Sequence, residues 1–170
     1  MTRFGRSPKE RLLDERAATW AGLRVVVADV ETTGLNTNSS RIVSVALSEI
    51  QSGRVLGGFA SLIDPGLDRI AASEIHGITN ETLRAAAAPS FGSVAPIILD
   101  RLTARDGETV LFAGHNAVFD ALMLHAELVR VGQAFPAVVI LDTKVLAARA
   151  GGPASNLHEL ATTLGLVATD

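Results

Sequence analysis

The spacing of apolar positions along the chain predicts an alternation of strands and helices. Short apolar runs bounded by turn residues are typical of strands, whereas apolar residues at intervals of three or four are typical of helices. We expect strands at residues 24–29, 41–50, 55–63, 109–113 and 138–141. We expect helices at residues 8–20, 91–102 and 120–131, between the fifth strand and Ala150, and at 156–164. Capping residues from Thr79 to Thr82 predict a further short helix.

The order of these elements predicts an α/β fold. The second and third strands are separated only by the turn residues 51–54, which favours antiparallel pairing of neighbouring strands. Later in the chain, strands alternate with helices, and such elements pack as layers on a common sheet. We therefore expect a mixed five-stranded sheet flanked by helices.

Composition narrows the class of protein. A chain of 170 residues with 48% hydrophobic and 19% charged residues fits one globular domain, and the absence of cysteine excludes disulfides and thiolate metal sites. A net charge of −3 gives no large basic surface for binding duplex nucleic acid. The sequence has neither a signal-peptide pattern nor an apolar stretch of membrane-spanning length. We expect a cytoplasmic protein with no membrane partner.

Two acidic residues at the end of the first predicted strand indicate a metal site. Asp29 and Glu31 lie two positions apart, so on a strand their side chains point to the same face, while Val30 points to the other. Two neighbouring carboxylates repel each other and resist burial unless a positive charge lies between them. A divalent cation that prefers oxygen ligands would supply that charge.

A second acidic position follows the fourth predicted strand. Gly114 permits a tight transition from strand to helix, and Asn116 is expected to cap the helix that begins near Asp120. Taken alone, an aspartate in the first turn of a helix is most simply explained by its favourable interaction with the helix dipole.

The acidic positions occur within two motifs that resemble those of a known family. The motifs are Asp29-x-Glu31-Thr32-Thr33-Gly34 and His115-Asn116-Ala117-x-Phe119-Asp120, and they resemble the first two motifs of the DnaQ-like (DEDD-type) 3′→5′ exonucleases, which include the proofreading epsilon subunit of bacterial DNA polymerase III. The segments 75–79, 141–143 and 157–160 are also similar, so the resemblance covers residues 24–166.

This resemblance implies a ribonuclease H-like fold and a site for two Mg²⁺ or Mn²⁺ ions. It makes Asp29, Glu31 and Asp120 three of the four metal-binding, catalytic carboxylates. In similar enzymes the turn after the first acids contacts the terminal nucleotide. The implied substrate-binding residues are Thr32, Thr33, Leu35, His76, Asn116 and Phe119. Two alternatives stay open: Leu35 and Phe119 as core residues, and His76 as a capping or surface histidine.

The third motif of the family is absent from the sequence. That motif supplies a histidine general base and, five residues later, the fourth acid, after the helix that corresponds to residues 156–164. His158 lies within that helix and is followed five positions later by Thr163, so it does not match. We therefore expect residues 24–170 to form an exonuclease domain that lacks its last catalytic helix, preceded by a charged helical lead-in at residues 1–23. An incomplete chain and a degenerate, non-catalytic relative both explain the absence, and the intact first two motifs favour the former.

The sequence thus favours a metal-dependent 3′→5′ exonuclease that acts on a single-stranded or frayed DNA 3′ end. A DNA polymerase subunit is a candidate partner. One alternative is a non-catalytic relative that binds nucleic acid or a polymerase, and another is an oligoribonuclease-like enzyme that acts on RNA.

Overall fold

A five-stranded mixed sheet forms the centre of the molecule. The computed structural model describes residues 23–105, 107–152 and 156–166. The sheet has the order β3-β2-β1-β4-β5, in which β1, β2 and β3 are antiparallel neighbours and β4 and β5 run parallel to β1. The strands are β1 (Leu23–Thr32), β2 (Ile42–Gln51), β3 (Arg54–Leu62), β4 (Thr109–Gly114) and β5 (Val139–Asp142).

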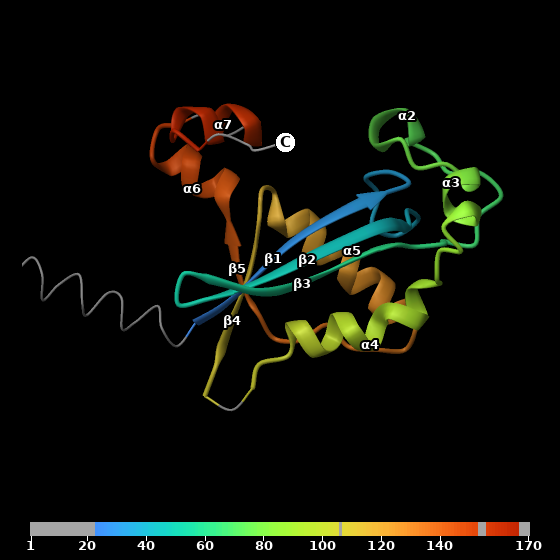
Figure 1. Ribbon diagram of the computed structural model, residues 1–170, viewed down its shortest axis with the longest axis horizontal. Coiled ribbons are helices and arrows are strands. Elements are labelled where there is room, and N and C mark those ends of the chain that lie inside the picture. The colour runs from blue at the N-terminus through green and yellow to red at the C-terminus, as the bar shows by residue number, and fades with distance from the viewer. Residues whose placement is uncertain (1–22, 106, 153–155, 167–170) are drawn as a thin grey trace, which may run out of the picture.

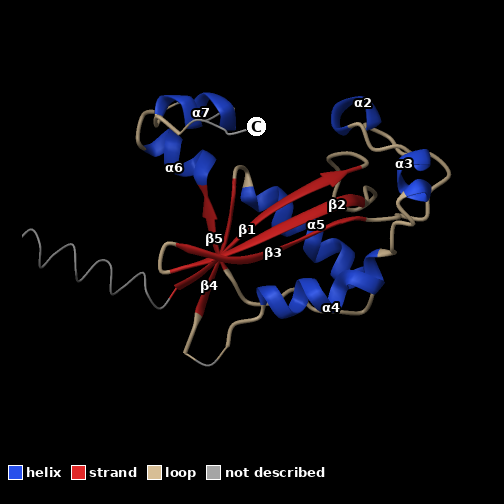
Figure 2. Ribbon diagram, in the orientation of Figure 1, coloured by secondary structure: helices blue, strands red, loops and turns tan. Residues whose placement is uncertain are grey.

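Helices flank this sheet (Figure 2). They are α2 (Ser73–His76), α3 (Asn80–Ala85), α4 (Phe91–Leu102), α5 (Ala117–Arg130), α6 (Thr143–Arg149) and α7 (Leu157–Thr163). The helices α2 and α3 lie together on the side toward which β1 points, whereas α6 and α7 lie together beyond β5 (Figure 1). The predicted mixed sheet with flanking helices is therefore confirmed.

The main core lies between one face of the sheet and the helices α4 and α5. Alternate residues of β1, among them Val26, Ala28 and Val30, are buried in it together with Phe112 of β4 and Met123 of α5. The hairpin between β2 and β3 turns through Ser52 at φ 50° and Gly53 at φ 73°. Two positive φ angles are those of a type I′ turn, whose twist matches that of the flanking strands.

Several predicted boundaries differ from the observed ones. β1 continues past Asp29 to Thr32, because β2 pairs with it as far as Thr32 across a register shift after Glu31. The helix α5 begins at Ala117, three residues before the predicted start at Asp120. The short helix α2 was not predicted, whereas Thr79 and Thr82 form the expected capping box at the start of α3. The predicted lead-in helix lies outside the described residues.

A buried arginine stabilises the end of the sheet at which β1 begins. Arg24 is 1% exposed. Its guanidinium donates to Glu108 at 3.1 Å, to Glu49 at 3.3 Å, and to the Thr103 carbonyl at 2.6 Å. Arg101 also pairs with Glu49. The two arginines and two glutamates have balanced charges, and Arg24 connects β1 to β2 and to the segment after α4.

Replacing Arg24 with methionine should lower the free energy of unfolding by about 3 kcal/mol, because Glu49 would keep its charge in a mostly buried position with one partner fewer. Urea titration would measure the change. In the matched control Arg54→Met, the side chain is exposed, and a change below about 0.5 kcal/mol is expected. Equal stability of the two variants would contradict this role of Arg24.

Candidate active site

The carboxylates of β1 lie on the sheet face opposite the main core. Asp29 pairs with Ala46 and Glu31 with Ser44 of β2, and partners across an antiparallel pair share a face. Asp29 is exposed and Glu31 is partly exposed, whereas Val30 between them is buried. The expectation that the two acids point the same way is therefore met, although they lie within the strand and not beyond its end.

Asp120 approaches the same part of β1 from helix α5. It is 6% exposed, and its Oδ1 accepts a hydrogen bond from the backbone N–H of Val30 at 3.0 Å. This N–H is available because the pairing of β1 with β4 ends at Val27 and Ala113, before β4 turns into α5. The hydrogen bond brings Asp120 to the stretch of β1 between Asp29 and Glu31.

A glycine permits the turn from β4 into α5. A Cβ atom at Gly114 would lie 3.0 Å from the Ala28 carbonyl oxygen and 3.3 Å from the Ala117 Cβ, both closer than ordinary van der Waals contact. Any larger residue would push the start of α5 away from β1. The expected role of Gly114 in a tight strand-to-helix transition is thus explained by the close approach of the two backbones.

Asp120 is difficult to ionise in this environment. Burial raises the pKa of Asp120 to about 6, and the nearby charges of Asp29 and Asp142 also raise it, while the hydrogen bond from Val30 acts in the opposite direction. A perturbed carboxylic acid beside other carboxylates is typical of a functional site. A cation placed among these groups would favour the ionised form of all of them.

The start of α5 depends on Asp142, a residue that the sequence analysis did not assign to the site. Asn116 occupies the N-cap position of α5, as predicted, but it has φ 76° and its side chain makes no capping hydrogen bond. Instead its backbone N–H donates to Asp142 Oδ1 at 3.0 Å, and the same oxygen accepts from the N–H of Lys144 at 2.9 Å. The exposed Asn116 side chain remains available to a ligand. The similarity of segment 141–143 was the only sequence signal for Asp142.

Two histidines have tautomers that their hydrogen bonds define. Thr143 donates its hydroxyl proton to the Gly114 carbonyl at 3.0 Å, so at 3.1 Å it accepts from Nδ1 of His115. In His76, Nδ1 accepts from the N–H of Ile78 at 3.0 Å, which leaves the proton on Nε2. Both Nε2 atoms are buried without a partner among the described residues. In His115 this nitrogen carries an unused lone pair, and in His76 it carries an unused proton.

The remaining predicted contact residues have different environments. The hydroxyl of Thr32 donates to the Gly34 carbonyl at 2.8 Å, and that of Thr33 accepts from the N–H of Arg41 at 3.0 Å, so both shape the loop after β1. Leu35 in that loop is 84% exposed and is not a core residue. Phe119 packs against the main core, which favours the core interpretation for its ring.

The carboxylates fit a hard divalent cation in their chemistry. Carboxylate oxygens are preferred ligands of Mg²⁺ and Mn²⁺, and Asp29 is close enough to Asp120 to raise its pKa. Within the described ranges, no three Asp, Glu, His or Cys side chains converge closely enough to form a metal-binding group. The donor set is therefore suitable but not assembled into a complete coordination sphere.

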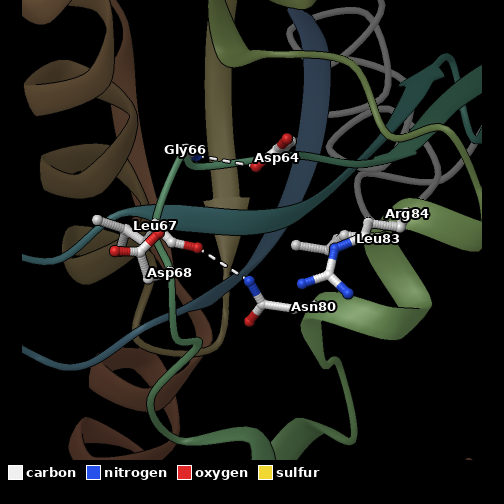
Figure 3. Close-up of a pocket in the computed structure, with 7 residues that line it drawn as sticks. All are labelled: Asp64, Gly66, Leu67, Asp68, Asn80, Leu83 and Arg84. Carbon is white, nitrogen blue, oxygen red and sulfur yellow. Dashed lines mark hydrogen bonds between the residues drawn. The ribbon is translucent and has the colours of Figure 1, made fainter.

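A separate hollow of about 260 Å³ lies beside α3 (Figure 3). Asp64 accepts from the N–H of Gly66 at 2.8 Å, and Asn80 donates to the Leu67 carbonyl at 2.9 Å. These hydrogen bonds occupy the side chains in shaping the loop before α2. None of the predicted site residues lines this hollow.

Over the part of the chain that the structure describes, no helix is long and apolar enough to cross a membrane.

The raised pKa of Asp120 predicts a pH dependence of stability. Because the folded state holds its proton more tightly than the unfolded state, the free energy of unfolding should fall as the pH rises from about 4 to about 6. After allowance for solvent screening, the loss should be about 2 kcal/mol. Asp120→Asn should remove this loss in urea titrations with EDTA, whereas Asp100→Asn, an exposed site on α4, should retain it. If the free energy of unfolding of the Asp120→Asn variant depended on pH as it does in the wild type, the attribution of this pH dependence to Asp120 would be refuted.

Comparisons with known proteins agree with this geometry. The exonuclease family RNase_T matches residues 26–169. Exonuclease DPD1, chloroplastic/mitochondrial, of Arabidopsis thaliana is 33% identical over 117 residues, which are 67% of this chain and 37% of that protein. A PolC-type DNA polymerase III of Lacticaseibacillus paracasei is 29% identical over 144 residues, 84% of this chain and 9% of that protein. The chain thus spans a minor part of the length of these relatives.

The fold of the chain is also similar to that of a solved exonuclease structure. Escherichia coli exonuclease I in complex with a dT13 oligonucleotide matches with a TM-score of 0.72 and 20% identity, over 86% of this chain and 36% of that chain. This likeness confirms the ribonuclease H-like fold. The matching family is one of exonucleases, and exonucleases of this family generally use divalent metals. Taken with acids that β1 and α5 bring together, the match over residues 26–169 establishes that the chain belongs to the RNase_T family of exonucleases.

Proposed function

We propose that this exonuclease domain removes nucleotides from the 3′ end of single-stranded or frayed DNA, in the 3′→5′ direction, using two Mg²⁺ or Mn²⁺ ions. The observation that supports the proposal is the hydrogen bond from the Val30 N–H to Asp120, which attaches the Asp120 carboxylate to the backbone of β1 between Asp29 and Glu31. The dT13 oligonucleotide in the exonuclease I structure supports a single-stranded DNA substrate.

Asp29, Glu31 and Asp120 are the residues that would hold the metal. When bound, the ions would supply an activated water and stabilise the leaving 3′-oxygen. Asp29 and Glu31 would hold these ions on a strand that has neighbours on both sides. The hydrogen bond from the Val30 N–H would fix the orientation of the Asp120 carboxylate. A cation would also relieve the repulsion that raises the pKa of Asp120.

The surrounding residues would bind the terminal nucleotide. The exposed Leu35 side chain is free to pack against a base. His76 would act by lining the pocket, because its Nε2–H is buried. Thr32 and Thr33 would act by shaping the loop that carries Leu35, and Asn116 by its exposed amide. The Phe119 ring, which packs against the main core, would support these contact residues from inside the domain.

A second candidate is a non-catalytic relative that binds nucleic acid or a polymerase. The lack of a converged three-ligand group among the described residues favours it, and the similarity to PolC-type DNA polymerase III makes a polymerase a candidate partner. Action on RNA is the third possibility, since no residue of the site distinguishes a 2′-hydroxyl.

Asp29→Ala should reduce the metal-dependent release of mononucleotides from a labelled oligonucleotide by at least about a thousandfold, because a metal-holding carboxylate is lost. A 5′-labelled strand should shorten progressively from its 3′ end, and EDTA should stop the reaction. The exposed Asp100→Asn variant should retain full activity. Comparing DNA with RNA strands of the same sequence would assign the substrate.

Activity that survives both Asp29→Ala and EDTA would refute the proposed mechanism. Tight binding of the oligonucleotide with no turnover, even in a longer protein that supplies the missing histidine and fourth acid, would favour the non-catalytic candidate. Shortening from the 5′ end would refute the proposed direction.

A further inference from the structure

A buried carboxylate on α5 connects the candidate active site to the loop that follows β1. Glu127 is 1% exposed and lies on the same helix as Asp120. It accepts hydrogen bonds from Arg41 Nε at 2.7 Å, from Arg41 Nη2 at 3.2 Å, and from the backbone N–H of Ile42 at 3.1 Å. Arg130 Nη1 lies 3.3 Å from the same carboxylate. We refer to Glu127, Arg41 and Arg130 as the Glu127 cluster.

The two arginines of the Glu127 cluster also donate to backbone carbonyls of two loops. Arg130 Nη2 donates to the carbonyls of Thr37 at 3.1 Å and Asn38 at 3.0 Å. Arg41 Nη1 donates to the Pro65 carbonyl at 3.0 Å, where the chain leaves β3 toward α2. One carboxylate therefore orients two side chains that bind two separate loops.

The first of these loops, residues 33–41, carries the exposed Leu35. Its base is closed by the N–H of Thr33 donating to the Arg41 carbonyl at 2.9 Å, next to the Glu127 cluster. Leu35 is 84% exposed, so contacts of its own side chain do not fix its position. The backbone of the loop must fix it, and the described tertiary hydrogen bonds from side chains to the loop tip come from Arg130.

Loss of the carboxylate would weaken the attachment of the loop to α5, while the hydrogen bonds within the loop remain. Arg41 and Arg130 have side chains that are 28% and 27% exposed, so solvent can hydrate them when the anion is removed. Glutamine at position 127 would still accept from the Ile42 N–H but would no longer hold two guanidinium groups by charge. The metal-binding carboxylates are not members of the Glu127 cluster.

We propose that Glu127 is a positioning residue that holds the loop 33–41, and with it Leu35, in place against the terminal nucleotide. It acts on substrate binding and leaves metal binding unchanged. This inference rests on the proposed function for the identity of the substrate, whereas the restraint on the loop follows from the hydrogen bonds alone.

Glu127→Gln should increase amide hydrogen exchange in residues 33–41 while leaving exchange in the middle of β1 and β4 unchanged. The matched control is Glu49→Gln, which removes a buried carboxylate from the arginine pairs at the other end of the sheet. It should destabilise the fold without accelerating exchange in the loop. Isothermal titration should give the same Mn²⁺ affinity, within twofold, for wild type and Glu127→Gln.

On a single-stranded DNA oligonucleotide, Glu127→Gln should raise KM, and the Kd measured by fluorescence anisotropy, about tenfold, with kcat changed much less. Leu35→Ala should raise KM in the wild-type background but should have little further effect in the Glu127→Gln background, because the loop is already displaced. A residue with a purely structural role would give independent effects that multiply.

Three results would overturn the proposal in distinguishable ways. Unchanged exchange in residues 33–41 would show that Glu127 does not hold the loop. Faster exchange with unchanged KM and Kd, or independent effects of Leu35→Ala, would show that the held loop does not position substrate. A wild-type chain that neither binds nor cleaves the oligonucleotide would overturn the proposed function and the substrate role together, while the exchange result would still decide whether Glu127 restrains the loop.

Discussion

The hydrogen bond between the Val30 N–H and the Asp120 carboxylate is the constraint on which the candidate site depends. It exists because β4 ends where it does and leaves one backbone donor of β1 without a strand partner. Without a cation, this placement opposes folding, since it buries an acid beside others and raises its pKa. A fold that accepts such a cost at one position is typical of a site selected for chemistry and not for stability.

Charged residues have contrasting roles at the two ends of the sheet. Around Arg24, two arginines and two glutamates compensate one another and connect strands to the segment after α4. Around Asp29 and Asp120, carboxylates lie together without a basic partner among the described hydrogen bonds and ion pairs. The balanced end stabilises the fold, whereas the other end carries uncompensated negative charge among the described residues. This separation lets the site vary in charge while the far end of the sheet holds β1 in register.

Sequence patterns anticipated the elements of this fold better than its long-range contacts. The five strands, the helices α4 and α5, and the shared face of Asp29 and Glu31 follow from local periodicity. Arg24 and Glu127 were not anticipated, because charged residues are usually exposed and their partners lie as many as 84 and 86 positions away. The left-handed conformation of Asn116 and the role of Asp142 depend on a hydrogen bond between segments 26 positions apart. The order of the two acidic motifs, by contrast, was sufficient to indicate the family.

The central position of β1 has a consequence for how the molecule moves. β1 has β2 on one side and β4 on the other, so Asp29 and Glu31 lie on an interior strand, which is held on both sides, unlike the edge strands β3 and β5. The loop after β1 and the start of α5, by contrast, are attached through side-chain hydrogen bonds of a few residues, among them Arg130 and Asp142. Movement should therefore concentrate in the loop 33–41, while Asp29 and Glu31 stay fixed.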